Sequence, residues 1–406
     1  MNWLKKLKIN NVKVRHWVLL ALLLLIILTK MNLRWGLTYT FFIYPHIACF
    51  LSHVSDIFPF AIGDIFIALS IAWVILYPIY ELIIRKILIK KGIIKKGWFH
   101  QNPHVFKKKT VFGRVVEYLL WVYAWFYIAW GLNYSQPNVF VRIGMAPAEV
   151  SKQDLRDFAN RYVDSLNYLS EECNLPRKGF VFEGKTNSLK LATKDAVLCG
   201  YKKLAASSVF MGINTPFNQN PHVKTMVFSR LSSMSGVTGS MGPFFCEFTL
   251  NGDVLPHDYP ATYAHEFAHF LGVANEGEAN FYSYLVCTAS TDKAVRFSGY
   301  YQIFFHVLAN VFDILGEKEG EALVKRIRPE IINLAKSDRK YWLGKRCKVL
   351  DAAQDFIFDL YLRGNNVKEG RKSYSGVVAL ILSWEQKKKM LNSHITSHSN
   401  IKMHKK

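Results

Sequence analysis

Residues 264–280 read AHEFAHFLGVANEGEAN, and this stretch has the most informative spacing in the chain. His265 and His269 are four positions apart, so on a helix they share one face, with Cβ atoms about 5–6 Å apart. Two imidazoles at this spacing can bind the same zinc ion. Glu266 follows the first histidine, where it can accept a proton from a metal-bound water and pass it to a leaving amine.

The residues around these three predict a buried helix that ends at a sharp turn. The other faces of the helix are apolar, formed by Phe267, Ala268, Phe270 and Leu271. A His-Glu-His group buried there without a metal would be costly. Gly272 is expected to end the helix in a left-handed conformation and to reverse the chain.

Two carboxylates compete for the role of third zinc ligand. The spacing resembles that of thermolysin-like zinc peptidases, which place the ligand Glu on a second helix, a small residue three positions later and Asp or Asn four positions later. Glu276, with Ala279 and Asn280 at these offsets, matches the pattern. Asn280 is then expected to hydrogen-bond the outer nitrogen of His265. Glu278 remains the alternative ligand.

Composition excludes several protein classes. The chain has 406 residues, 50% of them hydrophobic, and its six cysteines are scattered, so neither disorder nor a small disulfide-rich scaffold fits. Its net charge of +22 would suit a nucleic-acid or a membrane partner. The first 133 residues hold 17 Lys/Arg and 4 Asp/Glu, and they are also the most apolar part. Basic blocks beside apolar runs favour a membrane protein, and no nucleic-acid partner is expected.

Residues 1–133 are expected to form a membrane domain. Three apolar runs, at about 17–33, 59–84 and 113–132, predict transmembrane helices. The first run would also suit a signal peptide, but no small-residue cleavage site follows it. The segment 85–112 is strongly basic and is expected to stay in the cytoplasm. With the N-terminus also inside, this gives a multi-pass protein of the inner (plasma) membrane whose remaining domain is extracytoplasmic.

Residues 134–390 are expected to form this extracytoplasmic domain, of α+β class and mostly helical. A capped amphipathic helix opens at Ser151, and residues 224–250 read as a small β-sheet. Other helices are predicted at 189–206, 260–270, 276–289, 300–315, 317–336, 350–362 and 376–391. Pro329 should split the 317–336 helix. The polar tail 391–406 is predicted to be disordered.

Two further residues are weaker candidates for the cleft. Glu247 lies in the apolar strand PFFCEFTL, and it would line the cleft if this strand were the edge to which extended peptides add. An outward-facing position on the strand is an equal alternative. Tyr300 could donate a hydrogen bond to an oxyanion, although aromatic core packing is favoured.

Several stretches together resemble domain-of-unknown-function family 3810, bacterial membrane proteins with a zinc-peptidase-like signature. These are HEFAHFLGVANEGEANFYSYL, FSRLSSMSGVTGSMGPFFCEFTLN, RFSGY (296–300), KSYSGVV (372–378) and GLNY (131–134). By its motif, the resemblance implies a metal-dependent hydrolase. It supplies no substrate.

The sequence therefore predicts three transmembrane helices followed by a zincin-like domain of the gluzincin type. We expect a membrane-anchored zinc metallopeptidase that acts on a peptide or protein substrate, with Zn²⁺ held by His265, His269 and Glu276. Two alternatives remain open. The zinc site could hydrolyse another envelope amide or a lipid-linked compound, or the metal could be structural in a non-catalytic envelope protein.

Overall fold

The computed structural model describes residues 14–84, 108–147, 151–176, 186–207, 209–219, 221–350 and 376–403, together with 87, 90, 91 and 352. Most of the described residues are helical, and they include one three-stranded sheet. The expectation of a mostly helical fold with a small sheet is confirmed. Nearly all of the predicted helix 350–362 and most of the basic segment 85–112 lie outside the described residues.

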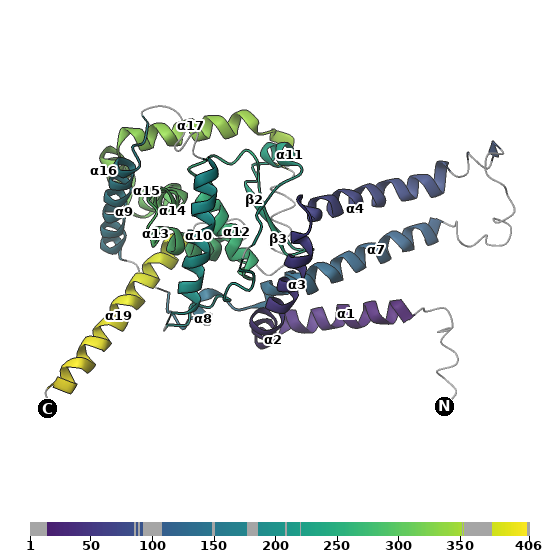
Figure 1. Ribbon diagram of the computed structural model, residues 1–406, viewed down its shortest axis with the longest axis horizontal. Helices are drawn as coiled ribbons and strands as arrows, with labels where there is room; N and C mark the ends of the chain where they lie inside the picture. The colour runs from purple at the N-terminus through teal and green to yellow at the C-terminus, as the bar shows by residue number, and fades with distance from the viewer. Residues whose placement is uncertain are drawn as a thin grey trace.

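Three long apolar helices project side by side from the rest of the protein (Figure 1). They are α1 (Val14–Met31), α4 (Ile62–Ile79), which η3 (Tyr80–Ile84) continues, and α7 (Lys108–Ala129). Each is long and apolar enough to cross a membrane, and little of each is buried inside the protein. Their positions agree with the three runs predicted from sequence. The C-terminal ends of α1 and α7 and the N-terminal end of α4 lie on the same side, against the domain.

Short helices link α1 to α4 and belong to the domain core. They are α2 (Leu33–Thr38), η2 (Tyr39–Ile43) and α3 (Tyr44–Asp56). Tyr44 and Ala48 are fully buried, and Lys224 donates to the Ser55 carbonyl at 2.7 Å. The apolar helices are therefore joined to the domain through packed structure.

The sheet has the strand order β1-β3-β2, formed by Lys224–Thr225, Glu247–Leu250 and Gly239–Gly242 respectively. β1 runs parallel to β3 and β2 runs antiparallel to it. All four residues of the central strand β3 are buried. Part of the predicted β-rich stretch is instead the short helix α11 (Ser229–Met234).

Three helices form the centre of the domain: α12 (Tyr259–Phe270), α13 (Glu276–Thr288) and α14 (Lys293–Gln302). Around them lie η5 (Gly131–Ser135), α8 (Val139–Arg142), α9 (Lys152–Glu172), α10 (Thr186–Ala205), α15 (Phe304–Leu315), α16 (Glu317–Arg326) and α17 (Pro329–Lys345). The capping box at Ser151 and the break at Pro329 are confirmed. The predicted helix 300–315 is divided at Ile303 between α14 and α15.

The last helix, α19 (Val377–Met403), runs through most of the range that we expected to be disordered. Its outer part projects away from the domain (Figure 1). Residues 385–391 read EQKKKML, and these are good helix formers, so the helix can continue beyond the point where it contacts the domain.

Candidate metal centre

A tight turn brings α13 back alongside α12. α12 ends at Phe270, and Gly272 takes the left-handed conformation with φ +93°, as the sequence predicted. The side chain of Asn275 then caps α13 by accepting a hydrogen bond from the Glu278 amide at 3.0 Å. The first turn of α13 therefore lies next to the last two turns of α12, which carry the histidines.

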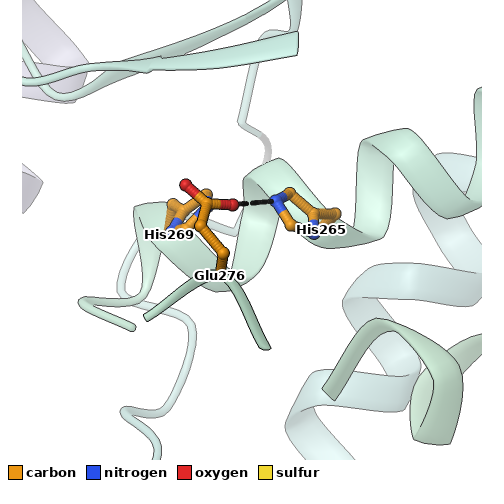
Figure 2. A group of neighbouring side chains, drawn as sticks. All are labelled: His265, His269 and Glu276. Carbon is orange, nitrogen blue, oxygen red and sulfur yellow. Dashed lines mark hydrogen bonds and ion pairs between the residues drawn. The ribbon is translucent and has the colours of Figure 1, made fainter. Parts of the chain in front are cut away.

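His265, His269 and Glu276 converge at this place (Figure 2). The two Nε2 atoms are 3.1 Å apart. The Oε2 atom of Glu276 lies 3.1 Å from His265 Nε2 and 3.4 Å from His269 Nε2. The three potential ligand atoms thus point to one location from two helices.

The outer nitrogens of both rings are held by hydrogen-bond acceptors. His265 Nδ1 lies 2.8 Å from Asn280 Oδ1, the contact expected from the sequence, and His269 Nδ1 lies 2.6 Å from the Val273 carbonyl. Gln302 donates to the same Asn280 oxygen at 3.0 Å and so fixes which amide atom faces His265. Because each Nδ1 must donate a proton, the neutral rings present lone pairs at Nε2.

The donor set fits a zinc ion. Two Nε2 lone pairs and a carboxylate oxygen repel one another unless a proton or a cation lies between them. Two histidines and one glutamate are a known ligand set for catalytic zinc, which keeps a fourth position open. The side chains of His265 and Glu276 are each 13% exposed, so the site is reachable from solvent. Among the described residues, no fourth His, Cys, Asp or Glu joins this group.

Without a metal, the three residues share protons. Burial alone lowers the pKa of His269, but the Glu276 carboxylate more than offsets this effect and raises that pKa to about 9. Burial acts in the opposite direction on Glu276, and the two histidines overcome it, so the pKa of Glu276 lies well below its usual range. A cation at this point would replace the proton on His269.

Glu266 is buried between the histidines and the edge strand β2. Burial raises the pKa of its carboxylate, and the nearby Met241 backbone opposes this rise only in part. Gly239 lies so close that a Cβ atom there would be 2.5 Å from Glu266 Oε1. β2 therefore packs directly against this carboxylate. Neither Gly239 nor Met241 was predicted from the sequence to lie at the site.

Glu278, the alternative ligand, lies elsewhere. Its Oε2 accepts from Arg142 at 2.6 Å and its Oε1 accepts from the Val139 amide at 2.8 Å. Both side chains of the Arg142–Glu278 pair are almost completely buried. Two positions along a helix turn a side chain by about 200°, so Glu278 cannot share the face of Glu276.

The two weaker candidates have other roles. Glu247 was expected to line a cleft at an edge strand or to face outward, and both expectations are wrong. It lies on the central strand, 3% exposed, where it pairs with Lys224 at 2.7 Å and accepts from the Gly63 amide of α4. Tyr300 packs against Tyr162 and Tyr284, as aromatic core packing requires.

A family model described as a protein of unknown function (DUF3810) matches residues 39–382. The chain belongs to DUF3810. The matched region contains α4, α7 and the whole candidate metal centre. The search of curated proteins and that of solved structures each found no match.

Sequence reasoning missed how this DUF3810 chain holds the C-terminal end of α12. Four side chains, from three other segments of the chain, donate to the carbonyl oxygens of residues 269–272. The pairs are Trp130 to His269 at 3.0 Å, Tyr44 to Phe270 at 2.8 Å, Asn214 to Leu271 at 2.9 Å and Gln136 to Gly272 at 2.7 Å. These donors lie 57–226 positions away in sequence, so no local pattern could reveal them.

A second cluster braces the other end of α12. His257 Nε2 lies 3.0 Å from Asp338 of α17 and 3.7 Å from Asp258, and Tyr301 of α14 donates to Asp338. Burial lowers the pKa of His257, but the two carboxylates raise it overall. The His257 side chain is 0% exposed, whereas Asp258 is 28% exposed, so the cluster lies at the edge of the core with its histidine inside.

Proposed function

We propose that this protein is a membrane-anchored, zinc-dependent metallopeptidase. The observation that carries the proposal is the convergence of His265 Nε2, His269 Nε2 and Glu276 Oε2, with both Nδ1 atoms tied outward to oxygen acceptors. His265, His269 and Glu276 would hold the metal. A bound zinc ion would supply a Lewis acid and would lower the pKa of a water at its open position.

Glu266 is the general base in this proposal. Its raised pKa suits a group that takes a proton and then releases it. In hydrolysis the water oxygen bonds to the acyl carbon and the C–N bond breaks. Glu266 takes a proton from the water and delivers it to the leaving nitrogen.

The position of β2 supports a peptide as substrate. β2 is an edge strand in the described sheet, and it lies directly beside Glu266. An extended peptide can add to such an edge by main-chain hydrogen bonds. We therefore propose that an extended peptide adds to β2, and not to the strand that carries Glu247.

We further propose that the domain is extracytoplasmic. The ends of α1, α4 and α7 that adjoin the domain lie on the same side of the three helices. The opposite ends lead to the basic N-terminus and to the basic segment 85–112, which the positive-inside rule assigns to the cytoplasm.

Metal content of the detergent-purified full chain tests the proposal. The wild type should carry about one zinc per chain. The zinc should be lost in His265→Ala/His269→Ala and kept in Glu266→Gln. Cleavage of a mixed peptide pool should be lost in both variants. A wild type without zinc contradicts the proposal, while a zinc-loaded wild type that cleaves no peptide but cleaves other amides or lipid-linked compounds transfers it to those substrates.

A further inference from the structure

The metal-binding helix is attached directly to the end of an apolar helix. Trp130 is the first residue after α7, and its indole N–H donates to the His269 carbonyl at 3.0 Å. The rings of Trp130 and His269 have centroids 6.3 Å apart. Trp130 is itself buried in the core of the domain. This contact therefore places the last turn of α12, which carries His269, directly at the end of the apolar helix α7.

The turn between β2 and β3 lies between two of the apolar helices. Phe244 in this turn has its ring centroid 4.9 Å from that of Phe66 on α4 and 6.3 Å from that of Phe126 on α7. Trp125 of α7 donates to the Phe244 carbonyl at 2.9 Å. Phe66 is four residues inside α4 and Phe126 three residues inside α7, so the turn reaches about one helical turn past their ends.

β2 leads from this turn to the metal centre. Gly242, at the turn, pairs with Glu247, and Gly239, three residues earlier, touches Glu266. At about 3.4 Å per residue, these positions are about 10 Å apart. β2 lies at the edge of the sheet and pairs only with β3 in the described sheet. The free edge of β2 therefore extends from the level of the apolar helix ends to the proposed general base.

Exposed apolar side chains surround the start of α4 at the same level. Ile57 and Phe60 precede α4, and Val227 is fixed there because its amide donates to Asp64 in the first turn at 2.8 Å. Phe228 follows and is also exposed. Such a patch, continuous with a candidate membrane span, suits contact with lipid.

We propose that the substrate is the juxtamembrane segment of an integral membrane protein, which leaves the bilayer along the edge of β2 and is hydrolysed within a few residues of the membrane surface. This inference rests on the proposed peptidase function. A substrate anchored in the bilayer reaches a site at the surface at high effective concentration. A soluble peptide lacks that advantage.

The position of the site can be measured without activity. The full chain in nanodiscs with headgroup-nitroxide lipids is loaded with Cu²⁺, and nitroxide relaxation is recorded. We expect faster relaxation in the wild type than in His265→Ala/His269→Ala, a variant that also corrects for Cu²⁺ on other histidines. Bound Cu²⁺ with no difference in relaxation overturns the inference but leaves the peptidase proposal standing. No difference in bound Cu²⁺ rejects the metal site itself.

The substrate class is tested with a single-span protein whose outer segment consists of identical repeats of one mixed peptide. It is reconstituted with the zinc-loaded chain, and cleavage positions are mapped by mass spectrometry. We expect the repeat next to the membrane to be cleaved at least about tenfold faster than the outermost one. Equal rates at all repeats overturn the inference.

A pair of phenylalanine variants separates docking at the membrane from catalysis. Phe244→Ser should reduce the preference for the membrane-proximal repeat while cleavage of a soluble peptide persists. Phe305→Ser is the matched control, because Phe305 is an exposed phenylalanine on α15, away from the apolar helices. It should retain the full preference. The same loss of preference in both variants would argue against a role for the β2–β3 turn.

Discussion

Trp130 donates its indole N–H to the backbone oxygen of His269, and so joins the end of an apolar helix to a candidate metal ligand. The same oxygen also accepts from the Gly272 amide at 3.0 Å, so the indole adds a second tie to the last turn of α12, where the chain leaves the helix. The same residue thus links the position of the apolar helices to the orientation of the histidine.

Trp130→Phe keeps an aromatic ring and removes this donor. We expect unfolding free energy to fall by about 0.5–1.5 kcal/mol, together with weaker metal binding, because the last turn of α12 loses a tie. Thermal unfolding and chelator competition measure the two effects. Trp125→Phe is the matched control. It also removes a hydrogen bond from an indole N–H to a backbone carbonyl, in this case that of Phe244. Unchanged metal affinity in Trp130→Phe would contradict this role.

Glu276→Gln and Glu278→Gln should have opposite signatures. Glu276→Gln removes a ligand, so zinc content should fall while the fold persists. Glu278→Gln leaves the buried Arg142 charge without its partner, and stability should fall by about 3–5 kcal/mol. Its folded fraction should keep zinc. Denaturant unfolding and metal analysis of the two variants decide the assignment, which is wrong if the zinc losses are reversed.

Asn280→Ala should weaken zinc binding about 10–100-fold, because His265 loses the acceptor that fixes its ring and tautomer. Asn251→Ala is a suitable control. Asn251 is also buried, and it bonds the Val237 carbonyl at 2.8 Å, outside the metal centre. Both variants should lose some stability, but only Asn280→Ala should lose affinity in a chelator titration. Equal affinities would show that Gln302 or water can replace Asn280.

Zinc affinity should rise with pH. In the metal-free protein the pKa of His269 is raised to about 9, so below that pH zinc must displace a proton. One displaced proton gives about a tenfold gain in affinity per pH unit between the ordinary histidine pKa near 6.5 and 9. The free energy of unfolding of the metal-free protein should fall as pH rises. A raised histidine pKa stabilises the fold at low pH, and this contribution disappears as pH rises through 9. Titrations across this range measure both slopes, and a flat affinity profile would contradict the assignment.

Local patterns predicted much of the site. The four-residue spacing of His265 and His269, the reversal at Gly272 and the break at Pro329 depend on helix geometry and backbone sterics within a few residues. The three apolar helices follow from length and composition alone. The Asn280 contact was also expected, from the resemblance of the spacing of Glu276, Ala279 and Asn280 to that of thermolysin-like zinc peptidases.

The sequence alone did not decide whether Glu276 or Glu278 faces the two histidines, because both residues lie in the first turn of α13. The angle between α12 and α13 decides which one faces the histidines, and that angle depends on packing across the domain. The position of Glu247 was predicted wrongly because a strand of apolar residues with one carboxylate has the same local sequence pattern at the edge of a sheet and at its centre.

The sequence by itself determined most of the helices, the shared face of His265 and His269 and the apolar spans, because these follow from periodicity along the chain. Only the tertiary structure decided which carboxylate faces the two histidines, which strand lies beside Glu266 and how α12 is attached to the end of α7. The last of these features joins residues 139 positions apart, Trp130 and His269, and such contacts form only when the whole domain packs.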